Sequence, residues 1–124
     1  MKEMKKTIDG IISYTGIGLH SGHISTITFK PADDDAGIVF VRTDLPGKPV
    51  IPADIDHVVD YSRGTTLGVG KATIATTEHV LAAIKGVDVD NIIIEINGPE
   101  VPVADGSAIV FVNLLKKVGI VESR

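Results

Sequence analysis

Segments with strand character, one of them with the alternation of apolar and polar residues expected of a strand with one buried face, follow one another along the first half of the chain. The alternation is clearest from Ile24 to Lys30, and Thr7 to Ser13 and Ile38 to Thr43 also have strand character. Loops rich in Gly, Pro and Asp separate these segments at residues 31–37 and 44–49. The pattern predicts an antiparallel meander.

The second half of the chain contains further extended segments. We expect Val50 to Val59 to be extended, and Leu67 to Val69 to pair with Ala72 to Ala75 across a glycine-containing turn. Asn91 to Asn97 is a nearly continuous apolar run, which is typical of a central strand.

Two helices are predicted between and after these strands. The first begins at Thr76 or Thr77 and stops at Gly86, and the second covers Ala108 to Val118 after a capping segment, Asp105 to Ser107. The order of elements predicts an α+β two-layer sandwich, with both helices on one face of a mostly antiparallel sheet.

The second predicted helix has an unusually wide apolar arc, formed by Ile109, Val110, Phe111, Val112, Leu114, Leu115 and Val118. A helix that covers only its own sheet needs an apolar stripe of little more than about 100°. Two interpretations remain open: the helix has a second apolar neighbour, such as another domain or subunit, or it is wholly buried in this one.

Composition narrows the functional classes. A length of 124 residues predicts a single domain, residues 1–124, with its own core. The net charge of −4, with the one basic cluster at residues 2–6, argues against a nucleic-acid surface. No apolar run reaches about 18 residues, so we expect no transmembrane segment and a cytoplasmic protein. Without cysteine, any metal site needs histidines and carboxylates.

The adjacent pair Glu78 and His79, at the start of the first predicted helix, is the strongest candidate for catalysis. Neighbouring helical side chains point about 100° apart, so the pair suits one metal ligand and one general base better than two ligands of one ion. The alternative is that Glu78 interacts only with the helix dipole and that His79 is a packed or surface histidine.

Two more histidines, His20 and His23, lie in a segment with glycines at positions 16, 18 and 22. Such a segment permits close backbone approach to a ligand, but a simple hairpin turn has the same composition. It is not a dinucleotide fingerprint, because residue 21 is Ser and no helix pattern follows.

Six ordered blocks together give the chain a family resemblance that no single motif provides: Thr15 to Gly22, Arg42 to Asp44, Ile51 to Ala53, Thr77 to Ala83, Asp90 to Ile92 and Pro99 to Ser107. Taken together they resemble the UDP-3-O-acyl-N-acetylglucosamine deacetylases of lipid A synthesis. The resemblance implies a zinc hydrolase acting on the N-acetyl group of a UDP-sugar that carries an O-linked acyl chain. It assigns Glu78 as general base, His79 as a zinc ligand and His20 as a polar residue near the cleft.

The resemblance covers only the first of the family's two similarly folded domains. The family's other zinc ligands and its catalytic acid belong to the second, and no histidine follows His79 in this sequence. A catalytic zinc normally has three protein ligands, so we expect the chain alone to be inactive and not to hold zinc stably. The expected partner is a second deacetylase domain, or a second copy through the exposed helix face. Two alternatives are a non-catalytic UDP-sugar-binding or regulatory module, and a homodimer that brings two Glu78–His79 pairs together.

Overall fold

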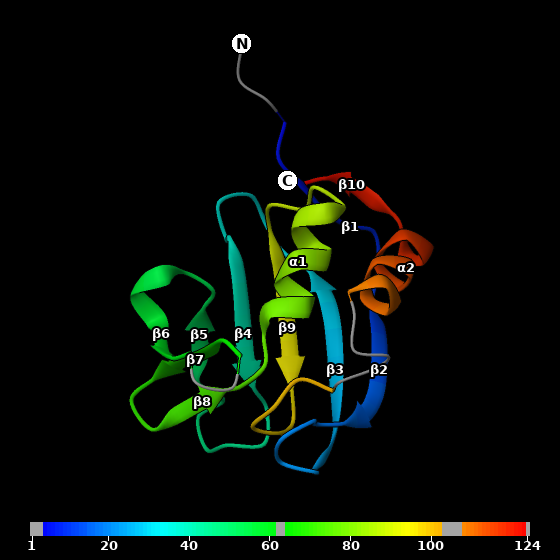
Figure 1. Ribbon diagram of the computed structural model, residues 1–124. Helices are drawn as coiled ribbons and strands as arrows, with labels where there is room; N and C mark the ends of the chain where they lie inside the picture. Colours follow the sequence, from blue (N-terminus) through cyan, green and yellow to red (C-terminus); the bar gives the residue numbers. More distant parts are fainter. Residues whose placement is uncertain (1–3, 62–63, 103–107, 124) are drawn as a thin grey trace.

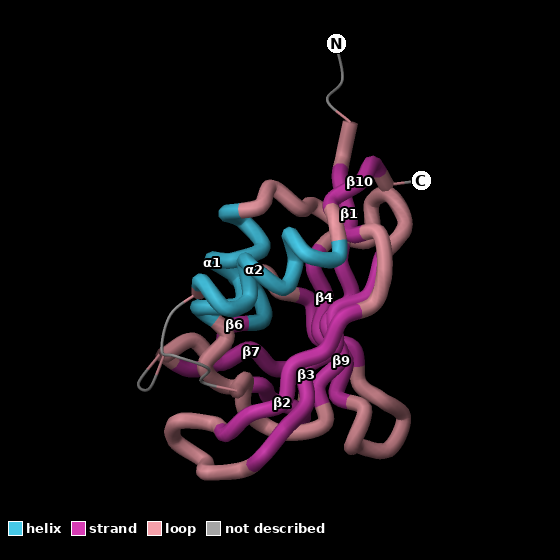
Figure 2. The backbone as a smooth tube through the Cα atoms, turned by 90° about the vertical axis from the view of Figure 1, so that its right-hand side faces the viewer, coloured by secondary structure: helices cyan, strands magenta, loops and turns pink. Residues whose placement is uncertain are grey.

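Two helices lie side by side on one face of a five-stranded sheet in the computed structural model, which describes residues 4–61, 64–102 and 108–123 (Figure 1). The helices are α1, Glu78–Gly86, and α2, Ile109–Val118. Seen from the side, the helices form one layer and the sheet the other (Figure 2). The predicted α+β two-layer sandwich is confirmed.

The strand order of the main sheet is β2-β3-β9-β4-β5. Its strands are β2 (Ile12–Ile17), β3 (Ile24–Pro31), β9 (Ile92–Ile96), β4 (Ile38–Arg42) and β5 (Val50–Pro52). All neighbours pair antiparallel except β4 and β9, which are parallel. The predicted antiparallel meander is wrong between β3 and β4, because β9 lies between them. The apolar run at 91–97 is therefore the central strand that the pattern predicted.

The core lies between the sheet and the helices. From β9, Ile92, Ile94 and Ile96 are fully buried beneath the helices, and α1 contributes Val80, Ala83 and Ile84. Phe111 of α2 meets Phe29 of β3 and Tyr14 of β2 edge-on, with ring centroids 6.2 Å and 5.9 Å apart. These aromatic contacts fix α2 over the β2–β3 side of the sheet.

Several boundaries differ from the sequence-based expectation. The segment 7–13 is two strands, because the chain bends at 9–10 between β1 (Lys6–Ile8) and β2. β1 pairs with β10 (Ile120–Glu122), a strand too short for the pattern to predict. The extended prediction for 50–59 is wrong at its centre, where Asp54 caps a 3-10 turn over Ile55–His57.

A separate three-stranded sheet contains β6 (Val58–Asp60), β7 (Thr66–Val69) and β8 (Ala72–Ile74). The predicted hairpin around Gly70 joins β7 to β8. The helix starts fall within one or two residues of those predicted. The cap expected at Asp105–Ser107, and the first residues of the N-terminal basic cluster, lie outside the described residues.

Helix α2 is not wholly buried, so that interpretation of its wide apolar arc is wrong. Phe111 and Leu115 are buried, whereas Ile109 is 51% exposed and Val112 and Leu114 are half-buried. None of the described helices is long and apolar enough to span a membrane.

Candidate active site

The start of α1 is tied to the loop between β6 and β7. Thr77, the buried N-cap residue, donates both its backbone N–H (3.1 Å) and its hydroxyl (3.0 Å) to the carbonyl oxygen of Thr65. Thr65 in return donates its N–H to Oε1 of Glu78 at 3.1 Å. The helix start and the loop therefore form one unit that holds the Glu78 carboxylate.

A glycine allows the loop to come this close to Glu78. Gly64 has a φ of +87°, and a Cβ atom built on it would lie 2.6 Å from Oε2 of Glu78. Any other residue there would collide with the carboxylate and strain the backbone. The carboxylate of Glu78 is thus packed against the backbone of residues 64–65.

His79 follows Glu78 in the first turn of α1, and both side chains are half-buried. The predicted adjacency of a carboxylate and an imidazole on a helix start is present. An anionic Glu78 also has a favourable interaction with the N-terminal end of the helix dipole.

His20 lies in the turn between β2 and β3, and its side chain is exposed. The turn is closed by hydrogen bonds from Gly18 N–H to the His23 carbonyl (2.9 Å) and from Gly22 N–H to the Gly18 carbonyl (3.0 Å). The conformation is that of a hairpin turn, as one interpretation of the glycines predicted. This turn lies at the end of the sheet opposite the chain termini (Figure 1).

Glu100, which sequence reasoning did not single out, connects this turn to the approach of α1. Its side chain accepts hydrogen bonds from the backbone N–H groups of His20 (3.0 Å) and Ser21 (2.8 Å) and from the hydroxyl of Thr76 (2.6 Å). Burial favours the neutral acid, but these donors outweigh it and lower the pKa of Glu100. Glu100 is therefore a buried residue, 2% exposed, whose carboxylate is surrounded by hydrogen-bond donors.

The Glu100 carboxylate lies so close to the backbone of Gly18 that a side chain at this position would collide with it. A Cβ atom on Gly18 would lie 2.4 Å from Oε1 of Glu100 and 2.7 Å from Oγ of Ser21. In the sequence, Glu100 is distinguished only as a single acidic residue among Pro99, Val101 and Pro102. A charge in an apolar, proline-bounded segment is rarely buried without a dedicated set of partners.

The backbone of Thr76, whose hydroxyl is hydrogen-bonded to Glu100, has a strained conformation. Its φ is +60°, in the left-handed region that β-branched residues avoid, and it is 4% exposed. Such a conformation costs of order 1–3 kcal/mol and persists only when the surroundings over-determine it. The 2.6 Å bond from its hydroxyl to Oε2 of Glu100 is one such constraint, one residue before the helix cap.

A match to a known protein family shows to which family the chain belongs. The family model described as LpxC, UDP-3-O-acyl N-acetylglycosamine deacetylase, matches residues 5–124. The chain belongs to this family. The resemblance found in the six sequence blocks is thereby confirmed.

Individual relatives of this deacetylase-family chain agree over almost all of its length. It is 56% identical over 118 residues to the bifunctional enzyme LpxC/FabZ of Chlorobaculum tepidum, covering 95% of this chain and 25% of that protein. The UDP-3-O-acyl-N-acetylglucosamine deacetylases of Bdellovibrio bacteriovorus and Myxococcus xanthus are 45% and 47% identical, covering 96% and 95% of this chain. The matches span 39% and 38% of those two proteins, so the chain spans well under half the length of these relatives.

The zinc site expected from the family resemblance is not complete within the described residues. Among them no group of three or more His, Cys, Asp or Glu side chains is arranged to hold a metal ion. A catalytic zinc normally has three protein ligands. In the described part of this deacetylase-family chain, no third side chain completes a metal site with the Glu78–His79 pair.

Proposed function

We propose that this chain is part of a zinc-dependent deacetylase that removes the N-acetyl group from a UDP-3-O-acyl-N-acetylglucosamine in lipid A synthesis. Family membership supports the reaction class, since relatives matched along the chain carry that name. The observation that carries the proposal is the Glu78 carboxylate, fixed by Thr65 and Gly64 beside His79 at the helix start.

In this proposal Glu78 is the general base and His79 one zinc ligand. The Thr65 N–H donates to Oε1 of Glu78 at 3.1 Å and orients the carboxylate, which accepts a proton from the attacking water. Zinc, when held by the complete site, supplies polarisation of the amide carbonyl and acidifies water. His79 points away from Glu78 by about 100° around the helix, so the base and the ligand do not compete.

The remaining zinc ligands come, in this proposal, from a second deacetylase domain. The outer side of α2 offers a docking surface, because Ile109 is 51% exposed and Val112 and Leu114 are half-buried. His20 lies near the cleft that the two parts form. A cytoplasmic location belongs to the same proposal, in keeping with a cysteine-free composition.

The first experiment measures zinc content and acetate release for the purified chain, alone and mixed with a separately produced second domain from a related deacetylase. We expect both only in the mixture. Glu78→Gln should keep zinc and lose about 10²-fold or more in kcat, whereas His79→Ala should lose zinc itself. Glu95→Gln, on the sheet face away from the helices, is the matched control and should change neither.

Two outcomes contradict this proposal. A mixture that forms a stable complex but has no zinc and no turnover supports a binding or regulatory module instead. A dimer of the chain whose zinc binding survives His79→Ala would remove His79 from the metal site.

A further inference from the structure

One carboxylate joins the two segments that carry the candidate site residues. Glu100 accepts the N–H groups of His20 and Ser21 on one side and the Thr76 hydroxyl on the other. Thr76 is one residue before the cap of α1 and two before Glu78. The His20 turn and the start of α1 are therefore connected through a single side chain, although His20 and Thr76 lie 56 positions apart in the sequence.

We propose that Glu100 is a positioning residue, whose buried side chain fixes the His20 turn relative to the helix start that bears Glu78 and His79. The inference rests on the proposed function insofar as these residues form the active site. Its geometry stands independently, in the short contacts of 2.6 Å to 3.0 Å that converge on one side chain.

The neighbours of Glu100 explain why a carboxylate is needed. Every bond that its side chain accepts comes from an N–H or O–H group, and an ionised carboxylate is an acceptor at both oxygens. Glutamine of the same shape would turn two donor hydrogens toward these donors. The replacement keeps the volume and breaks the connection, which makes Glu100→Gln an informative change.

Backbone bonds alone already attach this segment to the chain before α1. Ala75 N–H donates to the Pro99 carbonyl at 2.8 Å, and Val101 N–H donates to the Ala75 carbonyl at 3.1 Å. The Ser25 hydroxyl also donates to the backbone carbonyl of Glu100 at 3.0 Å. The segment is thus fastened without the carboxylate, and what the carboxylate adds is the connection between the turn and Thr76.

The test measures backbone amide chemical shifts and hydrogen exchange of the 124-residue chain by NMR. Thr76→Ala removes one arm of the connection and no bond made by His20 or Ser21, yet their amides should shift and exchange at least about tenfold faster. Ser25→Ala is the matched control, since it removes a bond to the backbone of Glu100 and leaves the carboxylate intact. It should leave both amides unchanged.

The catalytic consequence is measured in the mixture with the second domain. Glu100→Gln should lower kcat by about tenfold to a hundredfold with little change in KM, and Ser25→Ala should not. An unmoved pair of amides in Thr76→Ala, or an unchanged kcat in Glu100→Gln, overturns the proposal. If Glu100→Gln does not fold, the amide shifts in Thr76→Ala decide. If the wild-type mixture is inactive, the proposed function fails, and the same shifts still decide the connection.

Discussion

Two buried polar side chains flank the central strand β9, and they differ in kind. Asn91 immediately precedes the strand and Glu100 follows its end by four residues. They are 1% and 2% exposed, respectively. Each fastens distant parts of the chain to an end of β9, but one does so with a neutral amide and the other with a charge.

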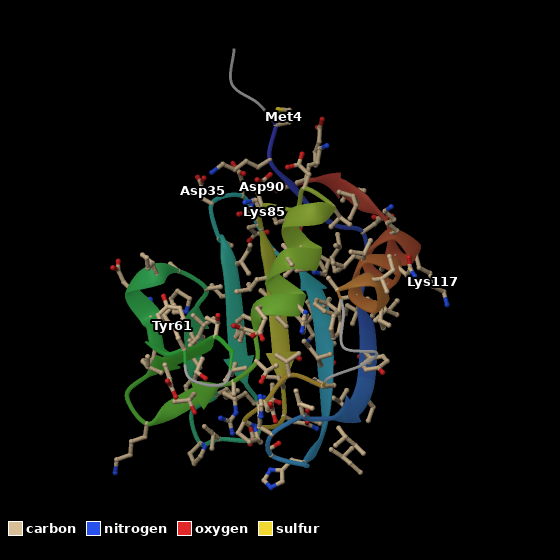
Figure 3. All side chains as sticks on the ribbon, in the orientation of Figure 1. Met4, Asp35, Tyr61, Lys85, Asp90 and Lys117 are labelled. Carbon is tan, nitrogen blue, oxygen red and sulfur yellow. The ribbon has the colours of Figure 1, made fainter. Side chains whose placement is uncertain are left out.

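At the Asn91 end of β9, side chains bind the described segments nearest the two ends of the chain. Asn91 accepts the Gly37 N–H at 2.8 Å and donates to the Ser123 hydroxyl at 2.9 Å, while the neighbouring Asp90 accepts the Lys6 N–H at 2.8 Å. In Figure 3 Asp90 lies with Asp35 and Lys85 at this end of the molecule, beside Met4. An amide suits this place because it must both accept and donate.

At the other end Glu100 meets donors only, and the candidate site lies there. Burying a charge is more costly than burying an amide and is tolerated only with a full set of partners. The contrast indicates that Asn91 stabilises the fold, whereas Glu100 both stabilises the fold and positions the candidate site. Four predictions test that division.

Glu100→Ala should have the largest effect on stability. It leaves the N–H groups of His20 and Ser21 and the Thr76 hydroxyl without their acceptor, and we expect a loss of about 3 kcal/mol in the free energy of unfolding. Urea unfolding of the chain measures it. The control is Glu95→Ala, whose 3.1 Å pair with Lys30 is partly exposed and worth about 0.5 kcal/mol. Equal losses in both variants would contradict a special role for Glu100.

Asn91→Ala should cost less, about 2 kcal/mol, because it leaves the half-buried Gly37 N–H without its acceptor and removes the bond to Ser123. The same unfolding experiment measures it. Asn97→Ala is the control: Asn97 also accepts a backbone N–H, from Thr26 at 2.8 Å, but it is exposed and water replaces it. A larger loss for Asn91→Ala than for Glu100→Ala would reverse the comparison between the two ends.

The hydrophobic pattern of the sequence was sufficient to predict the two layers of the fold, because that pattern reflects directly which side chains are buried. Alternation in 24–30 and the apolar run at 91–97 follow directly from which faces are covered, and helix α1 has a clear stop at Gly86. Strand β10 was missed and β1 was merged with β2, because β1 and β10 have three residues each and stabilise one another across 112 positions between Ile8 and Ile120. Pairing at that distance leaves no local pattern.

The candidate site was only partly predictable for the same reason. Glu78 and His79 are adjacent in the sequence, so their joint placement needed no tertiary information. Glu100 acquires its role from His20, Ser21 and Thr76, which are all distant in sequence. Its apolar, proline-bounded neighbours in the chain are compatible with burial but do not identify the donors that surround it.

Acid should weaken the contribution of Glu100 and leave that of Asn91 unchanged, because an amide side chain does not titrate. The folded-state pKa of Glu100 is lowered from its ordinary value of 4.5, so the unfolded chain binds the proton more tightly. Its contribution to stability is complete above about pH 4.5 and is lost as the pH falls through the lower, folded-state pKa. Stability measured against pH should therefore fall less steeply in acid for Glu100→Gln than for wild type, and equally steeply for Asn91→Ala. Identical acid slopes in wild type and Glu100→Gln would contradict this.

The smallest effect should come from Ser123→Ala, at the far edge of the Asn91 end. It removes the 2.9 Å bond from Asn91 Nδ2, but Ser123 is only half-buried and water can take its place, so we expect about 0.5 kcal/mol. Hydrogen exchange should quicken in β1 and β10 and remain unchanged at His20 and Ser21. That locality is the sharper part of the prediction, because faster exchange at both ends would mean that Asn91 and Glu100 belong to one cooperative unit. The two ends of β9 would then share a single role.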